Sequence, residues 1–198
     1  MDIKLFIGIV SAIIGIAAFA PYIKDMLTRK TRPHMFTWLI WVLTQGTAVV
    51  AMWTGGGGAG AITLTICLVL VFIVFLLSIK FGTRDITHSD TVVLIVALVA
   101  ILIWWQLDNP ILAVVIVSAI DVLGFIPSYR KTYKDPLSET ISTWIMYVLS
   151  NILAIIALEQ YNALTLTYIT SIVFAEILLL SIIYFRRLNT NSNSKLLK

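Results

Sequence analysis

Seven apolar segments follow one another along the chain, and the short stretches between them hold most of the charged residues. They cover residues 4–23, 35–54, 59–80, 91–107, 111–129, 140–158 and 163–185. Each approaches the ~20 residues that a helix needs to cross ~30 Å of hydrocarbon, and the fourth is the shortest. None alternates polar and apolar residues as a barrel strand does. Asn109 followed by Pro110 is typical of a helix start.

The composition agrees with a membrane protein. Of the 198 residues, 60% are hydrophobic and 12% are charged, whereas about a quarter of a soluble domain is charged. The single cysteine, Cys67, excludes an internal disulfide. We therefore predict an all-α integral membrane protein in the lipid bilayer, with seven transmembrane helices.

The basic residues predict its orientation. All but one of the 14 lysines and arginines fall in the turns after the first, third and fifth segments or in the tail, and the exception is Lys4. Because cytoplasmic loops are enriched in lysine and arginine, the N-terminus is expected outside and the C-terminus in the cytoplasm. The net charge of +4 is explained by this bias, so no nucleic-acid partner is expected.

The chain contains one arrangement twice. A shift of 106 positions places the segment 15–38, with its proline and final tryptophan, on 121–144 without a gap. Phe19 falls on Phe125, and Thr37 falls on Thr143. A period this long indicates duplicated halves. We expect a first three-helix repeat at 1–83, a linker helix at 84–108, a second three-helix repeat at 109–187 and a disordered cytoplasmic tail at 188–198. With an odd linker helix between them, the two repeats run parallel.

Three helices, a linker helix and three helices, with Pro21 and Pro127 near the cytoplasmic ends of the first helices, resemble the SWEET and PQ-loop superfamily. Tyr22 and Ser128 stand where that family has glutamine. The resemblance is nearest to a bacterial seven-helix branch, whose place would be the inner membrane. It implies a transporter that moves a small polar solute (a sugar, an amino acid or a vitamin-like molecule) by alternating access, and it does not imply sugar specificity.

Two acids lie deep in predicted helices. Asp121 is about ten residues, or ~15 Å, into the fifth, and Glu176 is about thirteen residues, or ~20 Å, into the seventh. No lysine, arginine or histidine lies in the interior of a predicted helix to pair with them. Intramembrane acids usually mark a functional site. We expect either a proton-coupling site or a binding site for a cationic or hydroxyl-rich solute; the alternative is a protonated acid that serves packing only.

An amide pair follows the repeat. Gln45 falls on Asn151, each seven residues beyond its tryptophan. The two amides could bind the solute from both sides of the central axis, or each could join helices within its own bundle.

The repeated prolines and tryptophans suggest moving parts. Pro21 and Pro127 each remove a backbone hydrogen bond and could act as hinges, or could end their helices before a basic turn. Trp38 and Trp144 could form a gate, or could be interfacial belt residues.

Other function classes find less support. A retinal photoreceptor needs a lysine in the last helix, and residues 163–185 contain none. No nucleophile and base suggest an enzyme, and the two histidines have no metal-ligand spacing, so no cofactor or metal is expected. A receptor or assembly factor without transport activity stays an alternative, and a homo-oligomer is possible.

Overall fold

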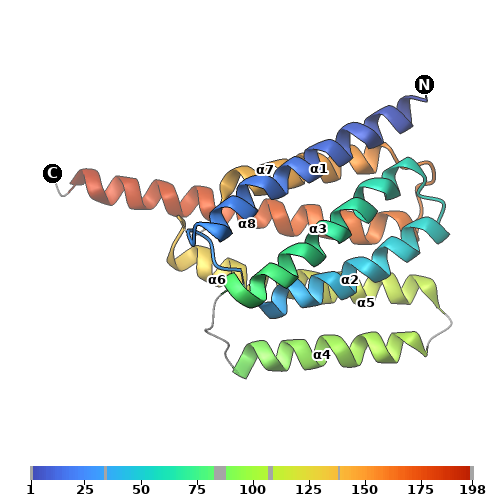
Figure 1. The fold of residues 1–198 in the computed structure, drawn as a ribbon, viewed down its shortest axis with the longest axis horizontal. Helices are drawn as coiled ribbons and strands as arrows, with labels where there is room; N and C mark the ends of the chain where they lie inside the picture. The colour runs from blue at the N-terminus through green and yellow to red at the C-terminus, as the bar shows by residue number, and fades with distance from the viewer. Residues whose placement is uncertain (1, 34, 83–87, 107–108, 138, 197–198) are drawn as a thin grey trace.

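The computed structural model describes residues 2–33, 35–82, 88–106, 109–137 and 139–196, and these residues form helices and connecting loops without strands. Figure 1 shows the helices as a bundle whose long axes run in roughly the same direction. Their bounds are α1 Ile3–Leu27, α2 Met35–Thr54, α3 Ala59–Phe81, α4 His88–Trp105, α5 Pro110–Gly124, α6 Ile126–Lys134, α7 Ile141–Ile156 and α8 Ala163–Leu196.

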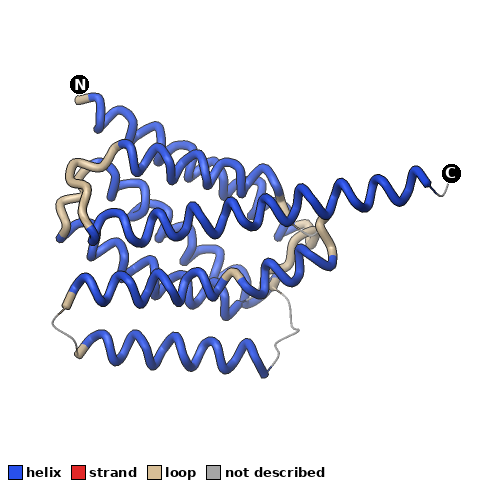
Figure 2. Tube along the Cα trace, turned by 180° about the vertical axis from the view of Figure 1, so that it is seen from behind, coloured by secondary structure: helices blue, strands red, loops and turns tan. Residues whose placement is uncertain are grey.

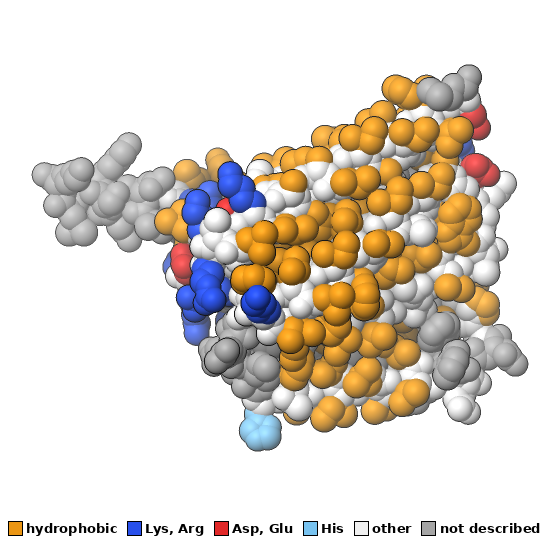
Figure 3. Space-filling model, in the orientation of Figure 1, with side chains coloured by type: hydrophobic (Ala, Val, Ile, Leu, Met, Phe, Trp, Pro, Cys, Tyr) orange, Lys and Arg blue, Asp and Glu red, His pale blue; other side chains and the backbone are white. Residues whose placement is uncertain are grey.

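Most of these helices have the length and composition of membrane spans. Five stretches qualify in the described residues: α1, α2, α3, the pair α5–α6 taken together, and α8 as far as Leu188. The shorter α7 is also apolar. Hydrophobic side chains cover the flank of the bundle in Figure 3, and large ones such as Phe72 and Phe174 are exposed. An apolar outer surface on an all-helical protein is what a lipid environment requires, so the predicted class of helical membrane protein is confirmed.

The helices pack in an arrangement that repeats. In the first half α3 contacts both α1 and α2, and in the second half α8 contacts both α7 and α5. Across the halves, α1 packs along α7 and α2 packs along α5. Helix α4 lies on the outside, against α2 and α5 (Figure 1). If α1 is exchanged with α5, α2 with α7 and α3 with α8, each of these contacts, apart from those of α4, becomes another contact in the same set.

Two hydrophobic clusters fill the core at opposite ends of the bundle. The basic-end cluster gathers around residues near the end of α1 and the start of α2, and its buried members are Phe19, Tyr22, Met26, Trp38, Trp41, Val71, Val74, Phe125, Trp144, Ala175, Leu179 and Ile183. The opposite-end cluster contains Ala48, Val49, Ala51, Met52, Ala61, Leu64, Val114, Val117, Ala154, Leu158, Tyr168 and Ile169. The first cluster is rich in aromatic rings, whereas the second contains several alanines and one aromatic ring, Tyr168.

Lysine and arginine side chains gather at the end of the bundle where α8 extends beyond the other helices (Figure 3). Two arginines there bind backbone carbonyls: Arg186 Nε lies 2.8 Å from the oxygen of Tyr133, and Arg187 Nε lies 3.0 Å from that of Pro136. At the other end, Lys4 Nζ donates to the carbonyl of Leu158 at 2.5 Å. The separation of charge expected from the sequence is therefore present in the structure.

Several helix ends predicted from the sequence agree with the structure. The second segment, 35–54, matches α2, and Asn109 caps α5 by accepting a hydrogen bond from the backbone N–H of Leu112 at 3.1 Å. The fourth segment is not the shortest helix, because α4 has 18 residues and α7 has 16. The repeat boundaries at 83, 84 and 108 lie outside the described residues.

The two repeated prolines behave differently. Pro21 lies inside α1, which continues to Leu27, so the alternative that it ends the helix is wrong. The turn beyond it buries Tyr22 and Met26 in the basic-end cluster, and this burial offsets the lost hydrogen bond.

Pro127, by contrast, follows a break. The segment predicted as one helix over 111–129 is two, because α5 ends at Gly124 and α6 begins at Ile126. The N–H of Phe125 bonds the carbonyl of Val122 at 3.1 Å, and the helical pattern resumes when Tyr129 bonds the carbonyl of Phe125 at 2.8 Å. Proline has no N–H for a continuous helix, which explains a break at this position.

The tail also differs from the prediction. A disordered tail was expected over 188–198, but α8 continues to Leu196, and residues 197 and 198 lie outside the described part of the chain. Figure 2 shows this end of α8 projecting past the bundle. A helix that is already formed gains one hydrogen bond for each residue it adds, so polar residues with modest propensity can extend it.

Candidate functional site

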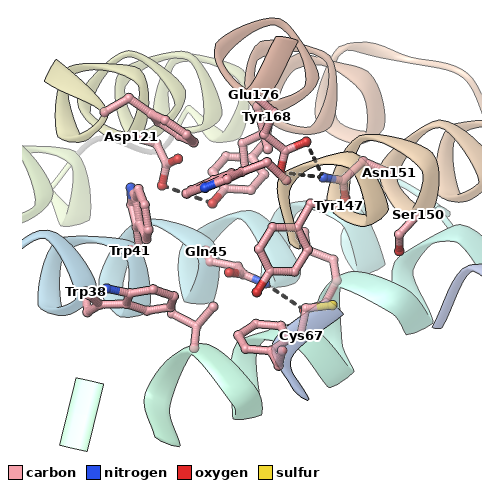
Figure 4. Close-up of a pocket in the computed structure, with 16 residues that line it drawn as sticks. Trp38, Trp41, Gln45, Cys67, Asp121, Tyr147, Ser150, Asn151, Tyr168 and Glu176 are labelled. Atoms are coloured by element: carbon pink, nitrogen blue, oxygen red, sulfur yellow. Dashed lines mark hydrogen bonds between the residues drawn. The ribbon is translucent and has the colours of Figure 1, made fainter. Parts of the chain in front are cut away.

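A cavity of about 70 Å³ lies in the middle of the bundle between the two halves. Both hydrophobic clusters contribute to its walls, so it lies between them along the helices. Figure 4 shows the side chains that line it. They are Phe19, Trp38, Trp41, Gln45, Leu64, Cys67, Val71, Asp121, Phe125, Trp144, Tyr147, Ser150, Asn151, Tyr168, Ile172 and Glu176.

Asp121 lies on α5, and only 2% of its surface is exposed. Tyr168 of α8 donates its phenolic hydrogen to Asp121 Oδ1 at 3.0 Å, and Thr44 of α2 donates to the same oxygen. Two donors on one oxygen stabilise a carboxylate. Since Thr44 belongs to the first half and Asp121 to the second, this hydrogen bond also joins the halves beside the cavity.

Glu176 lies on α8 and is 4% exposed. The amide nitrogen of Asn151, on α7, lies 3.1 Å from each of its two carboxylate oxygens (Figure 4). Among the described residues that line the cavity, none is a lysine, arginine or histidine. The cavity therefore holds two acidic groups without a cationic side chain to balance them.

The two amides each bond within their own half. Gln45 Nε2 donates to the backbone carbonyl of Leu64 on α3 at 3.0 Å, just as Asn151 on α7 donates to Glu176 on α8. Both also line the cavity. The geometry thus fits the interpretation that they join helices, and it leaves their amide groups at the surface that a solute would contact.

Aromatic rings form a continuous chain along the wall near the basic end. Consecutive ring centroids are 5.0–5.8 Å apart, and the rings come from both halves. This aromatic chain runs Trp38, Trp41, Phe125, Trp144, Tyr147, Phe19. Most of its contacts are tilted or edge-to-face, the geometries that aromatic pairs prefer. It crosses from α2 to the α5–α6 junction and from α7 to α1. It therefore spans both contacts between the halves, which we call the α2–α5 seam and the α1–α7 seam.

Two polar atoms of this wall lack partners within the described structure. The indole Nε1 of Trp41 and the hydroxyl of Tyr147 are buried without a hydrogen bond. Trp41 as a whole is 8% exposed. A buried donor without a partner costs about 1–3 kcal/mol, so such groups commonly await water, an ion or a ligand.

The predicted gate and hinge residues separate into two groups. Trp38 and Trp144 are buried and line the cavity, so neither lies on the lipid-facing surface as a belt residue would. The indole of Trp144 donates to Glu139 at 3.1 Å, and Glu139 forms an ion pair with Lys131 at 2.6 Å. Pro21 does not line the cavity, and Pro127 lies in the first turn of α6. A hinge role for the prolines stays a prediction.

Sequence reasoning did not identify Thr44, which donates to Asp121 beside the cavity, or Trp41, which lines it. One signal could have found the first, because Thr44 falls on Ser150 under the same shift of 106 positions that relates Gln45 to Asn151. Ser150 Oγ donates to the carbonyl of Ser11 at 2.8 Å, while Ser11 Oγ donates to that of Ser150 at 2.7 Å. The repeat thus places small polar residues at both seams.

Comparisons of the chain with protein-family models, curated proteins and solved structures find no match. Within the described residues, no group of three or more histidine, cysteine or acidic side chains could hold a metal ion. The chemistry of the site therefore follows from its carboxyls, amides and aromatic rings.

Proposed function

We propose that this protein is a SWEET-like transporter that moves a small polar solute across the membrane by alternating access. The proposal takes α1–α3 and α5–α8 as two parallel three-helix units of a seven-span protein, with the broken α5–α6 counted as one span and α4 as the linker. The interchangeable contacts of the two halves support this division. In transporters built from parallel repeats, substrate binds near the bilayer midplane at the repeat interface.

The observation that carries the proposal is the position of the cavity. It lies between the two units, is lined by both, and has a hydrophobic cluster toward each end. An assembly factor has no requirement for polar groups buried at this place. A transporter does, because its solute must be held out of water while access changes from one side to the other.

Contacts between the units close both ends. Away from the basic end, Asn162 Nδ2 donates to the carbonyl of Gly55 at 2.7 Å. At the basic end, Thr140 Oγ1 donates to Asp25 Oδ2 at 2.7 Å, next to the aromatic chain. Rocking of the units would break one set of contacts while the other holds. We place the basic end in the cytoplasm of a cell whose inner membrane holds the protein.

Asp121 and Glu176 are the groups through which transport could couple to protons. Each is buried in the interface or beside it, and neither has a cationic partner among the described lining residues. A solute that binds to these carboxyls would compete with a proton for them. Exchange of solute for proton is therefore the form of coupling that we propose.

The single cysteine permits a test that needs no known solute. Cys67 lines the cavity, and a protein with Cys67→Ser supplies the background of every labelling measurement. In proteoliposomes, membrane-impermeant thiol reagents added on either side are expected to reach Cys67 in a fraction of the molecules. If reagents reach Cys67 from neither side, or from one side only under all conditions, alternating access is wrong.

Flux measurements test the carboxyls directly. Uptake of a solute panel is compared with and without a pH gradient, for the native chain and for Asp121→Asn and Glu176→Gln. Glu159→Gln is the matched control, since Glu159 is exposed in the loop between α7 and α8. We expect both cavity variants to lose the pH dependence and the control to keep it. Unchanged pH-driven flux in both cavity variants would exclude proton coupling.

A further inference from the structure

The lining of the cavity has three properties that a solute must match at once: acidic groups without cationic partners, a wall of aromatic faces, and buried donors without acceptors. We propose that the cavity binds a small organic ammonium ion that also carries an acceptor oxygen, such as a hydroxyl or carbonyl oxygen. This inference rests on the proposed function, because it names the class of solute for the same cavity.

Charge is the first step. Asp121 and Glu176 line the cavity from α5 and α8, and the described lining contains no lysine, arginine or histidine. Ionised carboxylates are costly to bury unless a cation accompanies them. Asp121 already accepts hydrogen bonds from Thr44 and Tyr168 through one oxygen, and both are neutral donors that supply no positive charge. A positive solute supplies the missing countercharge, whereas a neutral or anionic solute does not.

The aromatic chain is the second step. Six rings succeed one another at 5.0–5.8 Å around the basic end of the cavity. Three of the six are tryptophans, the ring whose face attracts cations most strongly. Neutral sugars would also stack on such faces, but they would leave the two carboxyls without a countercharge. Aromatic faces next to carboxylates are the combination that binds organic ammonium groups.

The unpartnered donors are the third step. Trp41 Nε1 and the Tyr147 hydroxyl are buried without a partner. Figure 4 shows Trp41 on the side of the cavity near Asp121, and Tyr147 in the middle of the view near Gln45 and Cys67. Both residues line the cavity, so a solute with an acceptor oxygen could satisfy one of them while its ammonium group meets a carboxyl.

Size and coordination exclude the main competitors. The cavity of about 70 Å³ is roughly half the ~150 Å³ of a cavity that takes up benzene. A hexose has twice the heavy atoms of benzene and does not fit this conformation. A calcium ion needs six to eight oxygen ligands, and the wall here is largely aromatic. An ethanolammonium ion, with fewer heavy atoms than benzene, matches the space best.

Binding by purified protein in detergent tests the inference apart from transport. The probes are ethanolamine at neutral pH, where it is a cation, and propanol, its neutral isostere. The readouts are calorimetric affinity and the rate at which Cys67 is labelled. We expect ethanolamine to bind at least tenfold more tightly than propanol and to slow labelling of Cys67. Equal affinity for the two probes, or binding of propanol alone, would overturn the inference.

Variants locate the binding. Asp121→Asn and Glu176→Gln should each weaken ethanolamine binding at least tenfold, and Trp144→Leu should weaken it severalfold. The controls are Glu159→Gln and Trp53→Phe, because Trp53 is 48% exposed and does not line the cavity. If the controls weaken binding as much as the cavity variants, the site lies elsewhere. The isostere comparison needs only the native chain, so it decides the matter even if a variant fails to fold.

The outcomes also separate this inference from the proposed function. Ethanolamine binding without movement of any solute into liposomes would refute transport and leave the ammonium site standing. Flux of a neutral solute, together with equal affinity for ethanolamine and propanol, would support transport and refute the ammonium site.

Discussion

Replacing Gly60 by alanine tests a close approach between the two halves. Gly60 lies near the start of α3, and a Cβ atom at this position would stand 2.6 Å from the carbonyl oxygen of Ala154 and 2.7 Å from Leu158 Cδ2. Ordinary contact begins at 3.4 Å, so α3 or α7 would have to move by several tenths of an ångström. Leu158 is fully buried and has little room to give.

The matched control is Gly46→Ala. Gly46 lies within α2, and a Cβ atom there would meet nothing within 4 Å. Gly46 lies in a helix interior, where alanine gains up to ~1 kcal/mol of helix propensity, whereas Gly60 lies in the first turn of α3, where alanine gains less. The main difference is the cost of overpacking at Gly60, typically ~1–3 kcal/mol, and it acts in the same direction. At ~2–4 °C per kcal/mol for a chain of this size, Gly60→Ala should unfold roughly 2–12 °C below Gly46→Ala.

The assay is thermal unfolding of the purified variants in one detergent, followed by tryptophan fluorescence. Labelling of Cys67 in proteoliposomes gives a second readout, because a wedge between α3 and α7 should favour opening at the end away from the basic residues. The reasoning is refuted if Gly60→Ala unfolds at the same temperature as Gly46→Ala or above it. In that event the halves would not be in contact at Gly60.

Three further predictions concern polar contacts between helices. Ser11→Ala and Ser150→Ala, measured by reversible unfolding in detergent, should each lower the free energy of unfolding by ~0.5–1.5 kcal/mol, because each removes one hydrogen bond to a backbone carbonyl of the other helix. No loss in either variant would contradict the reciprocal hydrogen bonds. Lys131→Met should lower the free energy of unfolding by ~1–2 kcal/mol, which is less than the ~3–5 kcal/mol of a fully buried pair because Lys131 is 37% exposed. Lys131→Arg should restore much of the loss, and equal stability of the Met variant would show that Glu139 needs no cation. Tyr168→Phe removes the phenolic donor to Asp121 and should lower ethanolamine affinity severalfold, while the unfolding temperature falls by no more than a few degrees. Unchanged affinity would show that Tyr168 is not part of the site.

The sequence predicted the helical framework because long apolar runs between short turns leave little choice in a membrane. The bounds of α2 agree residue for residue, and those of α3 agree to within one residue. The sequence did not predict the break at Phe125, because the equivalent proline in the first half, Pro21, lies within a continuous helix. Burial of the turn that follows decides between the two outcomes, and burial depends on tertiary contacts.

The site was predicted in part for a similar reason. Asp121, Glu176, Gln45 and Asn151 are unusual residues in an apolar helix, so they could be recognised one by one, and the fold brings all four to one cavity. Threonine, tyrosine and tryptophan are ordinary in membrane helices. The shift of 106 positions pairs Phe19 with Phe125 and Trp38 with Trp144, but it does not show that these rings contact one another. Nothing in the local sequence marks the donors to Asp121, since that role arises only when α2, α5 and α8 meet.

The difference between the two seams explains why Asp121 has no acidic counterpart in the first half of the chain. Gly15 and Asp121 occupy equivalent positions, and so do Ser150 and Thr44. At the α2–α5 seam the side chain of Asp121 fills the space and accepts a hydrogen bond from Thr44. At the α1–α7 seam a Cβ atom on Gly15 would stand 2.9 Å from both Ser150 Oγ and Cys67 Sγ, so no acid fits there.

It follows that duplication alone would not produce a second acidic site. Close packing of α1 on α7 requires glycine where α5 carries its carboxyl, and the reciprocal bonds of Ser11 and Ser150 hold that seam closed. The acid could be kept only at the seam where the helices leave room for a side chain. Both seams thus border the cavity, but the α1–α7 seam is a tight contact and the α2–α5 seam carries the acid. A movement that opens the cavity should therefore separate α2 from α5 more than α1 from α7.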